Sequence, residues 1–96
     1  MSEHGLTVYY SSVPSTLKLK ADQTALCNLL TARNFPFRLV DVSQDAAELA
    51  EMRKKSGNNR LPQVFIGDRF FGTWETCCEL NEDGMLDRAL AAELWH

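Results

Sequence analysis

The fold of this chain is decided by the stretch Leu61-Pro62-Gln63-Val64-Phe65-Ile66-Gly67-Asp68-Arg69-Phe70-Phe71-Gly72-Thr73-Trp74-Glu75. Its residues 63–66 form a short, mostly apolar run, and residues 69–71 form a second run after Gly67-Asp68. A two-residue loop that begins with glycine is typical of a β-hairpin, because its first position needs a positive φ. Pro62 has no backbone N–H, so it fits the first position of a strand. The stretch therefore predicts two antiparallel strands, followed from about Thr73 by a helix.

The segment at the start of the chain predicts a strand and a helix. Residues 6–10 are mainly β-branched or aromatic and run into two serines, which is typical of a strand that ends in a loop. Pro14 fits the first turn of a helix with Ser12 or Val13 as its N-cap, and we expect this helix to continue to about Arg33. One face of the helix carries the leucines expected to pack on a sheet: Leu19, Leu26 and Leu30.

A second strand and a second helix are expected next. Residues 37–42 supply apolar surface after the break at Pro36. Because a helix connects them, the first two strands are expected to be parallel, with a right-handed crossover. Asp45 and Glu48 match a capping box, and the helix that they begin is expected to end at Gly57.

These elements follow the order β-α-β-α-β-β-α, and residues 85–94 predict an extra short helix at the end. Strands that alternate with helices indicate an α/β protein. With 96 residues, the chain has the length of one small domain, and we expect residues 1–96 to form a single one.

Composition and charge argue against several classes of protein. The net charge is −3, and long basic blocks are absent, so nucleic acid is not an expected partner. No apolar run approaches the roughly 20 residues of a membrane span, and residues 1–4 lack the features of a signal peptide. The three cysteines form no metal-ligand spacing and are odd in number, which is typical of reduced thiols. We therefore expect a cytoplasmic protein that binds neither a metal nor a membrane.

The hairpin stretch resembles the second half of a glutaredoxin. In the thioredoxin superfamily the proline at this place is cis, and the residue before it offers its backbone to glutathione or to an extended peptide. The resemblance implies these properties for Pro62 and Leu61. Glutaredoxins continue with Gly-Gly-Cys-Asp, which receives the γ-glutamyl end of glutathione, and Gly72-Thr73-Trp74-Glu75 stands in its place. The implied fold is thioredoxin-like (glutaredoxin-like), with three layers around a four-stranded mixed sheet.

The resemblance also locates the loop in which a glutaredoxin carries its redox chemistry. A catalytic glutaredoxin has Cys-Pro-x-Cys between the first strand and the first helix, where this chain has Val13-Pro14-Ser15-Thr16. A cysteine thiolate at a helix start attacks disulfides, and Val13 has no ionisable group. We therefore expect no catalytic residue in this loop, no cofactor such as an iron–sulfur cluster, and no enzyme activity.

The cysteines lie outside this loop. Cys27, in the first helix, is interpreted as a small hydrophobic residue at the edge of the core. Cys77 and Cys78 are neighbours in a predicted helix, where their side chains point about 100° apart, so at most one of them is buried. The alternative function is that of a thiol-disulfide oxidoreductase, or of a glutathione-binding redox protein, that uses Cys77 or Cys78.

Among glutaredoxin relatives, the chain is most similar to the SH3-domain-binding glutamic-acid-rich-like proteins, which lack the catalytic cysteines. The similarity is carried by residues 8–13, 39–45, 51–53, 62–63 and 67–75. Members are small cytosolic proteins without thiol-transferase activity, regarded as modulators or adaptors. The chain has no PxxP segment, so binding to an SH3 domain is not expected.

The resulting hypothesis is a non-catalytic binding or modulator module for a protein or peptide partner. The partner would enter the degenerate groove formed by Leu61, Pro62 and residues 72–75, beside the Val13 loop. Trp74 is either an anchor for the partner or a core residue. Glutathione is expected to bind weakly or not at all, because the link to a cysteine is lost and Thr73 and Trp74 replace smaller residues.

Overall fold

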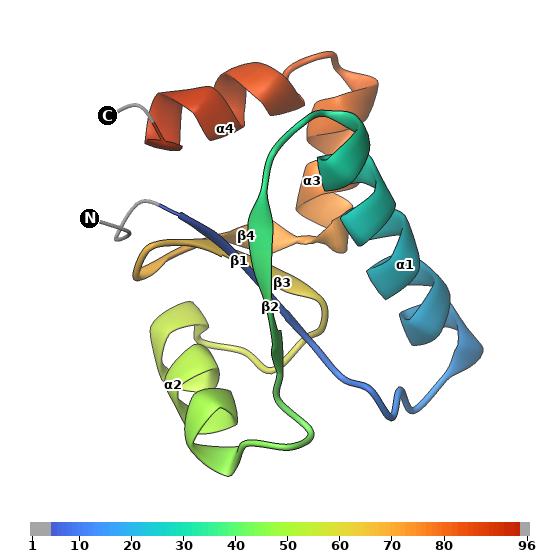
Figure 1. Cartoon of the computed structure of the whole chain (residues 1–96), viewed down its shortest axis with the longest axis vertical. Helices are drawn as coiled ribbons and strands as arrows, with labels where there is room; N and C mark the ends of the chain where they lie inside the picture. Colours follow the sequence, from blue (N-terminus) through green and yellow to red (C-terminus); the bar gives the residue numbers. More distant parts are fainter. Residues whose placement is uncertain (1–4, 95–96) are drawn as a thin grey trace.

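The computed structural model describes residues 5–94, and its elements follow the predicted order (Figure 1). The strands are β1 (Leu6–Tyr10), β2 (Phe37–Asp41), β3 (Gln63–Ile66) and β4 (Arg69–Thr73). The helices are α1 (Leu17–Ala32), α2 (Ala46–Ser56), α3 (Trp74–Glu82) and α4 (Leu86–Leu94). None of these helices combines the length and the apolar character that are needed to cross a membrane. The expectation about a signal peptide concerns residues 1–4, which lie outside the described range.

The four strands form one mixed sheet in the order β2-β1-β3-β4. Strand β1 is parallel to β2 and antiparallel to β3, and β3 is antiparallel to β4. Gly67 has a φ of 60°, as the predicted hairpin turn requires. Val64 pairs with Gly72 but Phe65 pairs with Phe70, so Phe71 is an extra residue that forms a bulge in β4.

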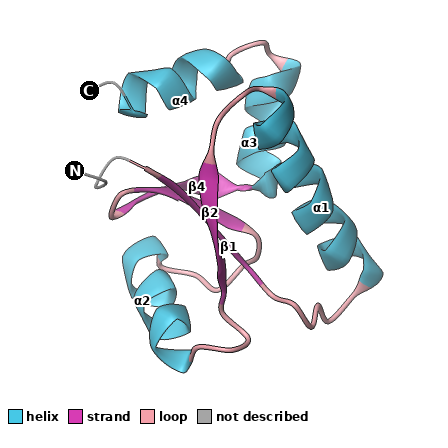
Figure 2. Ribbon diagram, in the orientation of Figure 1, coloured by secondary structure: helices cyan, strands magenta, loops and turns pink. Residues whose placement is uncertain are grey.

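Helices cover both faces of the sheet (Figures 1 and 2). On one face, α1, α3 and α4 enclose the larger core, which consists of Leu6, Val8, Leu26, Leu30, Val64, Ile66, Cys77, Leu86 and Leu90. On the other face, α2 covers a smaller core of Tyr9, Val42, Met52 and Phe65. The alternation of side chains along each strand separates the two cores. This arrangement confirms the predicted α/β, thioredoxin-like fold.

Helix α2 begins and ends at the predicted residues. The side chain of Asp45 accepts hydrogen bonds from the backbone N–H groups of Ala47 and Glu48, both at 3.1 Å. Gly57 ends the helix in the left-handed conformation with a φ of 79°. Local capping chemistry therefore sets both ends of this helix.

Helix α1 begins later than the sequence analysis predicted. Its N-cap is Thr16, whose hydroxyl accepts a hydrogen bond from the N–H of Leu19 at 3.0 Å. The N–H groups of Ser12 and Val13 are instead bonded to the side chains of Asp41 and Ser11, which hold these residues in a loop. The prediction that Ser12 or Val13 caps the helix is therefore wrong, and residues 11–16 form an irregular loop.

Candidate functional site

The predicted site residues gather at one end of the sheet. Tyr9 of β1 pairs with Gln63 of β3, and Gln63 pairs with Thr73 of β4. Beyond this row of residues β1 ends, β3 begins and β4 ends. The topology brings together three pieces there: residues 11–16, Leu61-Pro62 and residues 72–75.

The loop after β1 is held by Gln23, a residue of α1 that the sequence analysis missed. Its side-chain Oε1 accepts a hydrogen bond from the N–H of Ser11 at 2.9 Å, and its Nε2 donates to the C=O of Ser11 at 3.0 Å. Both residues are buried. The Ser11 hydroxyl accepts a further bond from the N–H of Val13 at 3.1 Å. One signal in the sequence could have indicated this role: Gln23 is a polar residue on the same face of the helix as the leucines that pack on the sheet.

Asp41, the last residue of β2, also holds this loop. Its Oδ1 accepts hydrogen bonds from the N–H groups of Ser12 and Ser43 at 3.1 and 3.0 Å, and from the Ser43 hydroxyl at 2.6 Å. The hydroxyl of Ser12 and then that of Ser43, followed by these two N–H groups, lower the pKa of Asp41 to about 2. Asp41 is therefore ionised at neutral pH, and the stabilisation by its charge is lost only as the pH falls through about 4 toward 2.

The fixed loop displays two large apolar side chains. Val13 is 69% exposed and Leu17, the first residue of α1, is 85% exposed. Pro14 is half-buried, whereas Ser15 and Thr16 are exposed. A single exposed apolar side chain is common, but two of them within five residues make this loop a candidate contact surface.

The segment before β3 agrees with the resemblance to thioredoxin-fold proteins. The peptide bond between Leu61 and Pro62 is cis, as predicted. Pro62 is buried and Leu61 is half-buried. None of the hydrogen bonds between described residues uses the backbone N–H or C=O of Leu61. These two groups are available to an extended ligand.

The start of α3 forms the third part of the site. The buried Gly72 lies so close to Thr76 that a Cβ atom on Gly72 would be 2.6 Å from the Thr76 side chain. The N–H of Thr73 donates to the Thr76 hydroxyl at 3.3 Å, and the Thr73 hydroxyl donates to the Glu75 carboxylate at 3.0 Å. The backbone N–H of Glu75 and then the Thr73 hydroxyl lower the pKa of Glu75. The chain's own carboxylate thus occupies the helix terminus, which is a place suited to an anion.

Trp74 is at least partly a core residue. Its side chain is half-buried and packs against the larger core between the sheet and α1, α3 and α4. The core interpretation of this residue therefore holds for its buried portion, and only the remainder of the ring is available to a partner.

The three cysteines are all free. Burial raises the pKa of Cys77 to about 12, and Cys77 belongs to the larger core. Cys78 is half-buried, and its Sγ lies 3.6 Å from a carboxylate oxygen of Glu82; burial and then this carboxylate raise its pKa. As predicted, only one member of the pair is buried. Burial also raises the pKa of Cys27. Within residues 5–94, no three His, Cys, Asp or Glu side chains are grouped as metal ligands would be.

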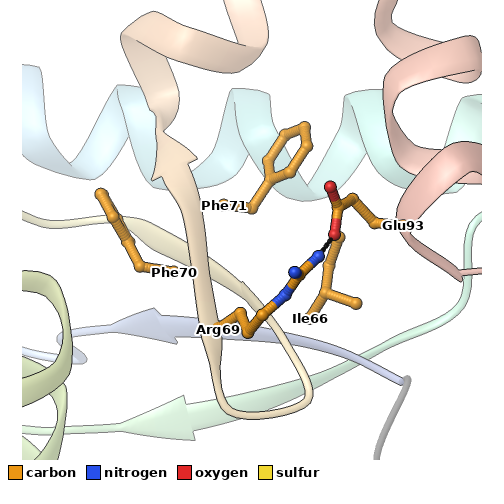
Figure 3. Close-up of a pocket in the computed structure, with 5 residues that line it drawn as sticks. All are labelled: Ile66, Arg69, Phe70, Phe71 and Glu93. Atoms are coloured by element: carbon orange, nitrogen blue, oxygen red, sulfur yellow. Dashed lines mark ion pairs between the residues drawn. The ribbon is translucent and has the colours of Figure 1, made fainter.

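Two hollows lie outside Leu61-Pro62 and residues 72–75. One, of about 410 Å³, lies at the opposite end of the hairpin, where Arg69 forms an ion pair with Glu93 of α4 (Figure 3). The other, of about 370 Å³, lies against α1 and is lined in part by Pro14, Cys27 and Leu39. Neither hollow is lined by Leu61 or Trp74, but the second one reaches the loop of residues 13–16 at Pro14.

Comparisons with known proteins agree with this architecture. The Glutaredoxin family model matches residues 24–71. Glutaredoxin 1 of Rickettsia typhi is 30% identical over 94% of this chain and 83% of its own length. A mutant of actin interacting protein 5 (Aip5) has a similar structure, with a TM-score of 0.76, 27% identity and coverage of 93% of this chain and 90% of that chain. A buckwheat glutaredoxin–glutathione complex has a TM-score of 0.73 at 19% identity, covering 95% of this chain and 80% of that chain.

The fold and the site define a glutaredoxin-like protein. The chain belongs to the glutaredoxin family, on the match to the family model and on the identity to the rickettsial glutaredoxin.

This membership corrects one expectation. The absence of a cysteine at Val13 led us to expect that the chain is not an enzyme, but its relatives are named glutaredoxins, which are oxidoreductases. The expectation considered a single loop, whereas the similarity extends over nearly the whole chain.

Proposed function

We propose that this glutaredoxin-family domain binds an extended segment of a protein partner. The binding surface consists of Leu61, Pro62 and residues 72–75, beside the loop of residues 13–16. The observation that carries the proposal is the backbone of Leu61, whose N–H and C=O have no partner among the described residues. An extended chain pairs with such groups and so gains main-chain hydrogen bonds that do not depend on its sequence.

Side chains around Leu61 indicate the chemistry of the partner. Val13 and Leu17 offer exposed apolar surface on one side. Lys18 and Arg60 are near enough to the Glu75 carboxylate to lower its pKa further. A partner segment with an apolar side chain and an adjacent acidic one would complement these residues.

The relatives support a protein as the partner. The solved structure with 27% identity is that of an actin interacting protein, which is named for binding another protein. Within the glutaredoxin family, we assign the chain to the SH3-domain-binding glutamic-acid-rich-like branch, on the motifs given above. Three free cysteines support a cytoplasmic location, because cytosolic thiols are kept reduced.

Glutathione is proposed to bind only weakly. Val13 offers no sulfur for a mixed disulfide, and the Glu75 carboxylate already takes up hydrogen-bond donors at the start of α3. Each polar contact that is missing costs about 0.5 to 1.5 kcal/mol, so two or three losses move the Kd toward the millimolar range.

Affinity capture with matched variants tests the protein partner. The double variant Val13→Asp/Leu17→Asp places charge on the loop, whereas Met85→Asp changes an exposed apolar residue in the turn before α4. We expect a partner that wild-type protein and Met85→Asp retain equally and that the double variant loses at least tenfold, measured by quantitative mass spectrometry. Retention of every enriched protein by the double variant would contradict the proposed surface.

A second function, thiol–disulfide exchange, is favoured by membership in the glutaredoxin family. Cys78 is the better candidate of the adjacent pair, because Cys77 is enclosed in the core. The raised pKa of Cys78 keeps its thiol mostly protonated at pH 7, so exchange through Cys78 would be slow.

The pH dependence of turnover tests this second function. With glutathione and hydroxyethyl disulfide, we expect a slow rate that rises about tenfold per pH unit from pH 7 to 8, as the thiolate fraction does below the pKa. Cys78→Ser should reduce the rate to that without protein, and Cys27→Ser serves as the control. Unchanged turnover in Cys78→Ser would exclude this thiol as the nucleophile.

A further inference from the structure

The loop between α2 and β3 (Figure 1) carries Leu61. It is organised around the side chain of Asn58. The Oδ1 atom of Asn58 accepts hydrogen bonds from the backbone N–H of Arg60 at 2.9 Å and from Nε2 of Gln63 at 2.8 Å. The Asn58 C=O accepts bonds from the Ser56 hydroxyl at 2.8 Å and from the same Nε2 of Gln63 at 3.2 Å. Asn58 thus contacts residues on both sides of Leu61-Pro62.

Gln63 connects this loop to the rigid part of the fold. It is fully buried and stands in the row that joins β1, β3 and β4. Its Oε1 atom is buried and has no hydrogen-bond partner among the described residues. The amide is therefore bonded only through Nε2, and both bonds go to Asn58. Asn58 is anchored through Gln63 to the start of the interior strand β3.

We infer that Asn58 is the positioning residue of the proposed binding surface. This inference rests on the proposed function. Asn58 holds Arg60 on one side and Gln63 on the other, and so fixes the intervening Leu61 before a ligand arrives. A backbone that is fixed in advance loses less conformational entropy when an extended segment pairs with it.

The adjacent Asn59 provides a matched control. It is exposed and makes no hydrogen bond to another described residue, although it has the same side chain and lies in the same loop. Asn58→Asp provides a rescue, because a carboxylate oxygen can accept both bonds that Oδ1 accepts, from Arg60 and Gln63. Only the long contact from Asn58 Nδ2 to the C=O of Ser56, at 3.4 Å, is lost.

The first measurement is made by NMR without ligand. In Asn58→Ala we expect the backbone order parameter of Leu61 to fall from a rigid value of about 0.85 to below about 0.6, with β1 unchanged. Exchange of the Arg60 amide should accelerate at least tenfold. Asn59→Ala and Asn58→Asp should both resemble the wild type. A rigid Leu61 in Asn58→Ala would overturn the inference, as would equal changes in Asn59→Ala.

The second measurement titrates each variant with reduced glutathione as a short peptide probe. We expect the Kd of Asn58→Ala to be at least tenfold higher than that of the wild type, with less than a threefold change for Asn58→Asp. An unchanged Kd in Asn58→Ala would overturn the role of Asn58 in binding. Probe binding to the wild type that leaves the NMR signals of Leu61 and residues 72–75 unperturbed, with Leu61 mobile only in Asn58→Ala, would contradict the proposed binding surface and leave the positioning of Leu61 established.

Discussion

Replacing Gly72 by alanine is expected to lower the free energy of unfolding by about 1 to 3 kcal/mol, the usual cost of adding a methyl group to a closely packed place. The added Cβ would lie 2.6 Å from both the Cβ and the Cγ2 of Thr76. Because Thr76 belongs to the first turn of α3, its Cβ can move away only if the helix start moves. The substitution therefore displaces the part of the site that contains Thr73 and Glu75.

A double-mutant cycle separates this contact from other effects of the substitution. Urea unfolding of Gly72→Ala, Thr76→Gly and the double variant gives the coupling energy between the two positions. We expect Gly72→Ala to cost at least 1 kcal/mol less in the Thr76→Gly background, because the atoms that the new methyl group meets are then absent. Equal costs in both backgrounds would show that Thr76 is not the obstacle.

Gln23→Ala is expected to have the larger effect of the two. It leaves the buried N–H and C=O of Ser11 without their partner, and each such group costs about 1 to 3 kcal/mol, so the free energy of unfolding is expected to fall by about 2 to 6 kcal/mol. The loop that carries Val13 is also released, because the hydroxyl that holds the Val13 N–H belongs to Ser11.

Two further variants give this prediction its controls. Asn28→Ala removes an exposed amide from the same helix and should change the stability by less than about 0.5 kcal/mol. Gln23→Glu keeps an acceptor for the Ser11 N–H but loses the donor at neutral pH. Its loss in free energy of unfolding should therefore lie between those of Asn28→Ala and Gln23→Ala. Urea unfolding measures the three costs, and a cost for Gln23→Ala no larger than that of Asn28→Ala would contradict the role of Gln23.

Local patterns predicted those elements whose cause is local. Gly67 allowed the hairpin to be predicted, and Asp45 and Gly57 marked the two ends of α2, because turns and caps depend on residues only a few positions apart. The start of α1 was mispredicted for the opposite reason. The loop before it is held by Gln23 and Asp41, which are 12 and 29 residues away from the serines that they bind. Contacts at that separation leave no periodic signal in the sequence.

The positions of the candidate site residues in the fold could be predicted from the sequence, whereas their contacts could be predicted only in part. Resemblance placed Leu61, Pro62 and Gly72 correctly at one end of the sheet, since the order of the strands follows from the order of the elements. It did not reveal that Asn58 anchors the segment through Gln63. This property depends on a side-chain contact that only the folded chain creates.

The bulge in β4 determines which parts of the hairpin tolerate a change in chain length. Phe71 is the extra residue, and it lies between the turn at Gly67-Asp68 and the residues that enter α3. Two residues inserted at the turn would lengthen both strands by one pair and leave residues 72–75 in their present orientation. A single residue inserted or deleted after Phe71 would move Gly72 and Trp74 each to the side of the chain opposite to the one that it occupies now. A change in chain length at the turn therefore preserves the candidate site, whereas a change beyond the bulge disrupts it.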